Sequence, residues 1–196
     1  MKTKHTLISF TFSLLMVSTA LANVDKGLKA YDAGDFATAL SQWEVFAKQG
    51  NASAQSNLGF MYDSGTGVVQ NHETAAKWYT LAANQGDAAA QSNLGGMYDV
   101  GKGVEENDTT AIKWLTLAAK QGYDHAQTYL GVMYVNGEGV DADYLRAYMW
   151  WHISAENGDA SAGTYKDSIA NKMTPAHLDQ AQTMVHRCLN SDYTHC

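Results

Sequence analysis

The sequence has few basic residues, and they do not gather anywhere. Its 13 lysines and arginines stand against 20 aspartates and glutamates, giving a formal net charge of −7. Removal of Lys2 and Lys4 with the leader described below leaves 11 basic residues and a net charge of −9. A surface this acidic, without a Lys/Arg cluster, is a poor match for a polyanion. We therefore expect no nucleic-acid partner.

Long apolar runs are also scarce. One run, Leu7–Val17, carries no charge, follows a basic start and precedes the small residues of Ala20–Ala22. It is shorter than the roughly 20 residues that span a bilayer, and this order of features is typical of a secretory signal peptide. We predict that residues 1–22 are a signal peptide cleaved after Ala22, in preference to a membrane-spanning helix. No cysteine follows that site, so we expect no lipid anchor. We predict that the cleaved protein is periplasmic or secreted and is not stably inserted in a membrane.

Cysteine is limited to Cys188 and Cys196, both near the end of the chain. An even count in an oxidising compartment favours a disulfide over two free thiols. Closing so short a loop contributes on the order of 2 kcal/mol to stability. Three nearby histidines, His177, His186 and His195, do not complete a standard structural zinc spacing with these cysteines. We predict a Cys188–Cys196 disulfide and no metal.

What the sequence does contain is a repeat. Leu58, Leu94 and Leu130 lie 36 residues apart, and the glycines that follow them directly share this spacing, as do the tryptophans at positions 78, 114 and 150. Such a period is typical of stacked supersecondary units, each too small to bury its own apolar face. The predicted parts are a signal peptide at 1–22, a partial helix pair at 23–50, three repeats at 51–86, 87–122 and 123–158, and capping helices at 159–196.

The first half of each repeat is predicted to be a helix with one buried face. In the first full repeat this face carries Ala54, Leu58 and Tyr62 at helical spacing. Gly59 lies mid-helix, where glycine costs up to about 1 kcal/mol relative to alanine, and we expect it to let the second helix come close. Each helix then ends at a Gly-x-Gly-Val loop, because two glycines permit positive φ and a sharp reversal.

The second half is predicted to be another helix, whose buried stripe combines a tryptophan with small residues. Ala75, Trp78 and Ala82 form this stripe in the first full repeat, and equivalent residues recur in the next two. Short polar side chains such as Asn51 and Asp87 stand where helices should begin and can accept hydrogen bonds from first-turn amides. In the third repeat a tyrosine takes this place, and the aspartate after it is expected to cap instead.

The pattern decays beyond residue 159. Lys166 replaces the core leucine and Asp167 the glycine, as expected of a terminal unit without a further neighbour. Thr174-Pro175 then opens a last helix, with Thr174 as N-cap and proline at the first helical position.

The pattern A-x-x-x-L-G-x-M-Y-x-x-G-x-G-V, followed by A-x-x-W and a closing Q/N-G, resembles the Sel-like repeats (SLR), which are related to tetratricopeptide repeats. The resemblance covers three full units, Asn51–Gly158. It implies an all-α fold, a right-handed α/α superhelix (solenoid) of stacked antiparallel helix pairs, whose first helices line a concave surface used for protein–protein contact. It also implies envelope or host proteins as partners. A cysteine-rich branch is linked to peptidoglycan and β-lactams, but its repeated cysteine pairs are absent here.

No complete catalytic motif is found. His72-Glu73 begins like a zinc-protease helix, but Ala76 stands where the second histidine would fall. The Gly-x-Gly loops do not continue into a phosphate-binding motif, and Asp141-x-Asp143 lacks the glycine and glutamate of a calcium loop. Neither Ser-x-x-Lys nor Lys-Thr-Gly occurs after the leader. We expect a non-enzymatic protein without cofactor or metal; a peptidoglycan- or β-lactam-binding or hydrolysing protein is the alternative.

The tandem pair Trp150-Trp151 is a further candidate, as a platform on which a sugar could stack. Trp150 aligns with the two core tryptophans, so Trp151, aligned with Tyr79 and Leu115, is the one to consider. We expect Trp151 to be partly buried instead.

The remaining surface is the face of the first helices opposite their buried stripe. Helical spacing places small, hydrogen-bonding and a few apolar side chains there: Ser53, Ser56, Asn57, Phe60, Asp63, Ala89, Ser92, Asn93, Gly96, Asp99, His125, Thr128, Tyr129 and Val132. Amides could fix a peptide backbone while Phe60 and Tyr129 act as anchors. A merely solvated face is the other interpretation. We predict a monomeric interaction module for a protein or peptide, and keep a self-associating structural piece as a third hypothesis.

Overall fold

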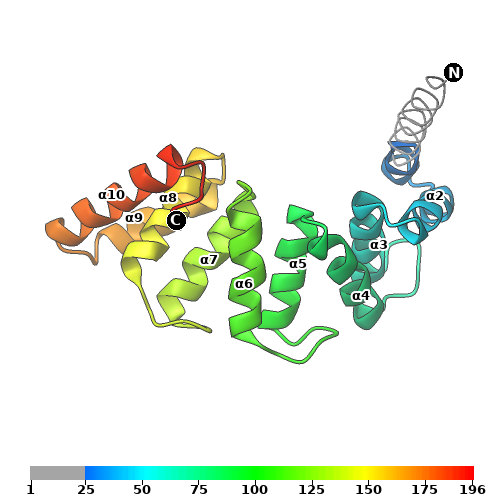
Figure 1. Ribbon diagram of the computed structural model, residues 1–196, viewed down its shortest axis with the longest axis horizontal. Helices are drawn as coiled ribbons and strands as arrows, with labels where there is room; N and C mark the ends of the chain where they lie inside the picture. Colours follow the sequence, from blue (N-terminus) through cyan, green and yellow to red (C-terminus); the bar gives the residue numbers. More distant parts are fainter. Residues whose placement is uncertain (1–24) are drawn as a thin grey trace, which may run out of the picture.

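The computed structural model describes residues 25–196. The predicted signal peptide and the first residues of the predicted partial helix pair lie outside this part of the chain. Within it every regular element is a helix. Figure 1 shows the helices stacked in chain order along the long axis of an elongated molecule. The repeat thus produces an extended array, as predicted.

The helices are short and of similar length. A helical segment over residues 25–32 is followed by α2 (Phe36–Lys48), α3 (Ala52–Ser64), α4 (His72–Asn84), α5 (Ala88–Asp99), α6 (Asp108–Ala119), α7 (Asp124–Asn136), α8 (Tyr144–Glu156), α9 (Ala160–Ala170) and α10 (Pro175–Asn190). The closest pairs are α3 with α4, α5 with α6, and α7 with α8. Each second helix then packs against the first helix of the next pair.

Short polar residues set the helix starts. Asn51 and Asp87 accept hydrogen bonds from amides in the first turns of α3 and α5, at 2.9 and 2.8 Å, which satisfies donors that a helix leaves free. The third repeat differs as expected. Its N-cap residue, Tyr123, makes no side-chain cap bond, and Asp124 instead accepts a hydrogen bond from the amide of His125 at 2.7 Å.

The core is divided into clusters that cross the boundaries between helix pairs. One cluster joins Ala39 and Trp43 of α2 to Leu58 of α3, and the next joins Ala82 of α4 to Leu94 of α5. A third runs from α6 to α10. Because each cluster draws side chains from at least two neighbouring pairs, no pair buries its apolar face alone, as is typical of a solenoid.

The buried stripe of α4 differs from the prediction at one position. Ala75 and Ala82 are fully buried as expected, but Trp78 is only half-buried. The large side chain without exposed surface is its neighbour Tyr79. A Cβ on Gly59 would lie 2.6 Å from the Tyr79 ring. The mid-helix glycine therefore allows close approach, as predicted, but it makes room for Tyr79 and not for the tryptophan.

The other two repeats follow the same rule. Gly95 faces Leu115, whose side chain lies 2.7 Å from where a Cβ would be, and Gly131 faces the indole of Trp151. Trp151 is consequently 6% exposed. The expectation of partial burial is wrong, and the indole has no free face on which a sugar could stack. Trp114, like Trp78, lies half-buried at the margin of the preceding cluster, whereas Trp150 is buried as predicted.

The second glycine of each inter-helix loop seats the loop on the preceding helix pair. Gly103 has φ +71°, and a Cβ there would overlap the backbone of His72 at the start of α4. Gly139 has φ +67° and lies in the same way against the backbone of Asp108 in α6. Both the positive φ and the contact require glycine. These seats fix the spacing of neighbouring pairs.

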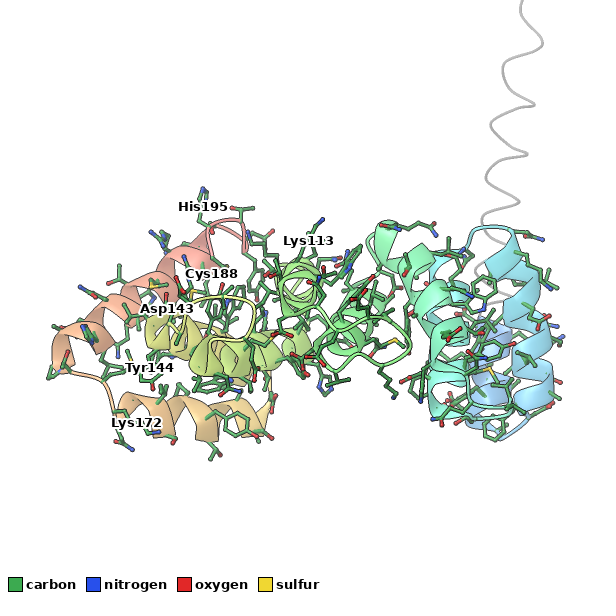
Figure 2. All side chains as sticks on the ribbon, turned by 90° about the horizontal axis from the view of Figure 1, so that it is seen from below. Lys113, Asp143, Tyr144, Lys172, Cys188 and His195 are labelled. Carbon is green, nitrogen blue, oxygen red and sulfur yellow. A yellow bond between two sulfur atoms is a disulfide. The ribbon has the colours of Figure 1, made fainter. Side chains whose placement is uncertain are left out.

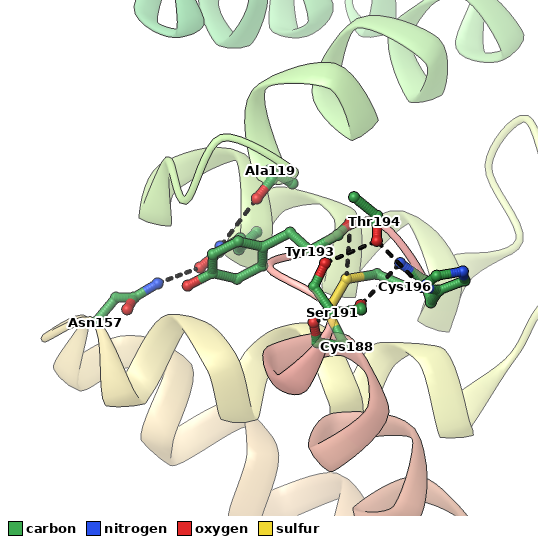
Figure 3. The surroundings of a disulfide bond; sticks show 9 residues. Ala119, Asn157, Cys188, Ser191, Tyr193, Thr194 and Cys196 are labelled. Carbon is green, nitrogen blue, oxygen red and sulfur yellow. Dashed lines mark hydrogen bonds between the residues drawn. A yellow bond between two sulfur atoms is a disulfide. The ribbon is translucent and has the colours of Figure 1, made fainter.

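The C-terminal helices close the array. α9 and α10 both pack against α8; Thr174 caps α10 by accepting a hydrogen bond from the amide of His177 at 3.2 Å. Cys188 is buried and forms a disulfide with Cys196, as predicted. The tail returns toward the third repeat, where Tyr193 lies beside the hydrogen bonds that Gln127 makes with Ala119 and Asn157 (Figure 3). His195 and Lys172 point outward at this end (Figure 2).

Candidate functional site

A cavity of about 500 Å³ opens across α3, α5 and α7. We call it the first-helix groove. Side chains and backbone from three successive repeats line it: Ser56, Asn57, Phe60, Ala89, Ser92, Asn93, Gly96, Leu115, Tyr123, His125 and Tyr129. The groove arises from the repetition, because equivalent positions of successive first helices line the same cavity.

The structure brings most of the predicted surface residues together here. Nine of them line the groove, and five lie outside its lining: Ser53, Asp63, Asp99, Thr128 and Val132. Sequence reasoning missed Leu115 and Tyr123. Leu115 belongs to a second helix, yet it reaches the groove because it packs against Gly95. That these residues bind a partner stays a prediction.

The two predicted anchors differ in their surroundings. Phe60 is 47% exposed, and its ring meets the edge of Tyr31 with 6.1 Å between centroids. Tyr129 is half-buried, and its hydroxyl donates a hydrogen bond to Asp99 Oδ2 at 2.5 Å. Burial, this hydrogen bond and the negative charges of Asp99 and Glu138 raise the pKa of Tyr129. The hydroxyl therefore remains a protonated donor held in one orientation.

Thr128 bonds to the second helix of its own repeat and to Asp159 at the start of the capping helices, and it does not line the groove. Its hydroxyl donates to Asp159 Oδ2 at 2.6 Å and lies 2.7 Å from Ser154 Oγ. Its carbonyl accepts the indole N–H of Trp151 at 3.0 Å. The hydrogen bond from Thr128 is the main reason that the pKa of Asp159 is lowered. These partners lie 23 to 31 residues away in the sequence, so helical spacing alone could not identify them.

Asp63 is likewise engaged outside the groove. Its Oδ1 lies 3.0 Å from both Lys102 Nζ and His72 Nδ1. Lys102 belongs to the loop between α5 and α6, so this ion pair crosses the boundary between two repeats. Both side chains are partly exposed, at 27% for Asp63 and 38% for Lys102, and the pair therefore contributes little to stability by itself.

A ladder of buried glutamines supports the first helices from behind. Gln55 Nε2 donates to the carbonyl of Ala47 at 3.0 Å, and Gln55 Oε1 accepts from Gln85 at 2.7 Å. Gln91 and Gln127 make the same pair of bonds in the next repeats. Sequence reasoning missed this network, although these glutamines recur 36 residues apart. A satisfied buried network favours one fixed arrangement of neighbouring helices.

Tyr79 leaves one polar atom unexplained. Within residues 25–196, its hydroxyl and His152 Nδ1 are buried without a hydrogen-bond partner. Burial is the largest cause of the raised pKa of Tyr79, followed by the negative charge of Asp63. The phenol is therefore neutral, and its ring fills the space left by the missing side chain of Gly59.

The described residues show no sign of a metal site or a membrane span. No group of three or more metal-binding side chains gathers anywhere in this part of the chain. None of its helices has both the length and the apolar character needed to cross a bilayer.

Helix pairs of constant length, stacked through shared core clusters, define an α/α-solenoid repeat protein. The Sel1 repeat model matches residues 52–87, 88–123 and 124–159, which is more than half of the chain. The chain belongs to the Sel1 repeat family, as its sequence pattern indicated. Sel1 repeats generally serve as protein-interaction modules, and proteins built from them are typically non-enzymatic scaffolds.

Solved structures confirm the fold. The chain is 38% identical to a Sel1 repeat protein from Oxalobacter formigenes, with a TM-score of 0.68 over 71% of this chain and 56% of that one. It is 34% identical to a protective antigen present in uropathogenic Escherichia coli strains that displays an SLR fold. There the TM-score is 0.75 over 81% of this chain and 35% of the other. The chain thus spans about half and about a third of these two proteins. No curated protein sequence matches it.

Proposed function

We propose that the protein is an exported, non-enzymatic adaptor that holds a peptide or protein segment in the first-helix groove. The observation that carries this proposal is the meeting of side chains from three repeats around one cavity of about 500 Å³. Membership of the Sel1 repeat family supports the interaction role. The groove offers apolar contact at Phe60 and polar contact at its amides.

Asn57 and Asn93 are the residues suited to hold a peptide backbone. They occupy equivalent positions of α3 and α5 and line the same groove. Neither side chain makes a hydrogen bond within the described part of the chain, so their donors and acceptors are free for a ligand.

Export is supported by the C-terminal disulfide. Bridges of this kind persist in oxidising compartments and are rare where thiols are kept reduced. The Cys188–Cys196 bridge therefore agrees with the predicted signal peptide. We propose the periplasm or the outside of the cell as the place of action, and a monomer as the working form.

The proposal is tested by selecting random dodecamer peptides on the purified protein and measuring the affinity of an enriched peptide by fluorescence anisotropy. A variant with Asn57→Ala, Asn93→Ala and Tyr129→Ala should bind at least tenfold more weakly. The matched control removes the same side chains elsewhere, with Asn84→Ala, Asn190→Ala and Tyr144→Ala, which are exposed outside the groove.

Circular dichroism must show equal helicity in both variants. If Tyr129→Ala lowers the unfolding temperature, the double variant N57A/N93A takes its place. Equal affinity of the groove variant and the control would contradict the proposal, as would the absence of any enriched peptide.

A further inference from the structure

The junctions between repeats carry different charges at equivalent positions. At the first junction Asp63, at the end of α3, is paired with Lys102 of the following loop at 3.0 Å. At the next junction the positions 36 residues later hold Asp99 and Glu138. An acidic residue thus stands where the first junction has its lysine. The second junction has two carboxylates and no lysine between them.

Both carboxylates lie near the groove. Asp99 Oδ2 accepts the hydroxyl hydrogen bond of Tyr129, which lines the groove. Glu138 is close enough for its charge to act on the same hydroxyl, and its Oε1 accepts a hydrogen bond from Asn136 Nδ2 at 3.0 Å. Neither carboxylate forms an ion pair within residues 25–196.

The groove has little positive charge of its own to offset these acids. Among its lining residues His125 alone can become cationic, and no lysine or arginine lines it. Burial, followed by the negative charges of Asp124 and Asp87, raises the pKa of Tyr123, which also lines the groove. A cavity surrounded by charges of one sign concentrates the field that a ligand meets there.

We propose that the groove selects a peptide segment bearing a lysine or arginine, whose charge pairs with Asp99 and Glu138. The ligand supplies the cation that Lys102 provides at the first junction. This inference rests on the proposed function and adds to it the chemistry of the partner: apolar contact against Phe60 and Tyr129, followed by one basic side chain. Charge complementarity of this kind determines specificity and the rate of encounter.

The test uses the same random dodecamer library and asks which residues are enriched. Peptides selected on the wild type should contain lysine or arginine at a fixed position at several times its frequency in the starting library. A fluorescein-labelled peptide from this set should bind at least tenfold more weakly when that residue is replaced by glutamine. Its affinity should also fall as sodium chloride rises from about 50 to about 500 mM.

Two variants locate the charge on the protein. Glu138→Lys copies the first junction and should weaken the basic peptide at least tenfold. Asp99→Asn keeps the shape of the side chain and should also weaken it. The control, Glu105→Lys, makes the same change in net charge at an exposed position outside the groove lining and should leave affinity within about twofold after allowance for long-range attraction.

The outcomes separate this inference from the function on which it rests. If peptides bind, and depend on Asn57 and Asn93, but show no enrichment of basic residues, the proposed function stands and the basic-ligand inference fails. Equal weakening by Glu138→Lys and Glu105→Lys would also overturn it, since net charge alone would explain the effect. If no enriched peptide depends on the groove, both are wrong.

Discussion

Gly131 in α7 lies directly against the indole of Trp151 in α8, with no space for a Cβ between them. Their contact closes the third helix pair, and the same contact recurs between Gly59 and Tyr79. The mid-helix glycine, which disfavours an isolated helix, is thus what allows a bulky side chain to be buried between the two helices of a pair.

Gly131→Ala should destabilise the protein by about 1–3 kcal/mol, because the added methyl group overlaps the indole ring. Gly96→Ala is the matched control, since it also lies within a helix but has nothing within 4 Å of the new Cβ. That change should stabilise by up to about 1 kcal/mol through helix propensity. Urea unfolding followed by circular dichroism measures both. Similar effects of the two variants would show that the glycine–indole contact has no energetic role.

Gln91→Ala should cost about 1–3 kcal/mol, since it removes a buried group that bonds to the carbonyl of Ala83 and to Gln121. Gln182→Ala, at an exposed position of α10, should change stability by less than about 0.5 kcal/mol. Thermal and urea unfolding of the two variants, compared with the wild type, give the answer. An equally small effect at Gln91 would mean that the glutamine ladder does not stabilise the stack.

Removing the disulfide by Cys188→Ala with Cys196→Ser should lower stability by about 2 kcal/mol. Tyr193 packs against the core cluster that runs from α6 to α10 and lies within the loop that the bridge closes, so its contact should loosen as well. The unfolding temperature with and without a reductant measures the effect. The reductant should lower it in the wild type and leave the variant unchanged; a reductant-insensitive wild type would contradict the prediction.

Acid should weaken the contact between Thr128 and Asp159. The hydrogen bond from Thr128 lowers the pKa of Asp159 from its ordinary value of 3.8 in the folded protein. Its contribution to stability is therefore complete above that ordinary value and is lost as the pH falls through the lower folded-state pKa. Thr128→Val should reduce the loss of unfolding temperature between about pH 5 and pH 2.5. An unchanged pH profile would show that another carboxylate governs this range.

A chromogenic cephalosporin should not be turned over by the purified protein. The groove lining contains Ser56 and Ser92 but no lysine, and neither serine begins a Ser-x-x-Lys motif. Absorbance of the ring-opened product over several hours is the measurement, with buffer alone as the baseline. Turnover that disappears in a Ser56→Ala or Ser92→Ala variant would instead support the hydrolase alternative.

The helix pairs and their stacking could be predicted because the residues that create them recur. Asn51, Leu58 and Gly59 each have a local reason to be where they are, as cap, core residue and packing glycine. The choice between Trp78 and Tyr79 could not be made in this way. Adjacent residues of a helix differ by only about 100° in direction, and the one that faces Gly59 is fixed by the rotation of one helix against another.

The groove was predictable in outline and not in detail. Equivalent positions of successive first helices must lie side by side, so Asn57 and Asn93 could be placed together from spacing alone. Asp63 and Asp99 each bond to a residue of the next repeat, and Thr128 bonds to Asp159 beyond its own repeat. Those contacts depend on how far one helix pair is shifted and rotated relative to the next. This arrangement cannot be predicted from the sequence of a single repeat.

The loop contacts formed by Gly103 and Gly139 maintain the shape of the array, and they are separate from the side chains that line the first-helix groove. Backbone-to-backbone contact at these two loops sets the step from one pair to the next, and neither glycine lines the groove. Side chains facing the cavity can consequently be exchanged without altering the curvature that holds them. The groove could therefore be adapted to a new ligand by substituting the side chains that line it, while the loop contacts at Gly103 and Gly139 are kept.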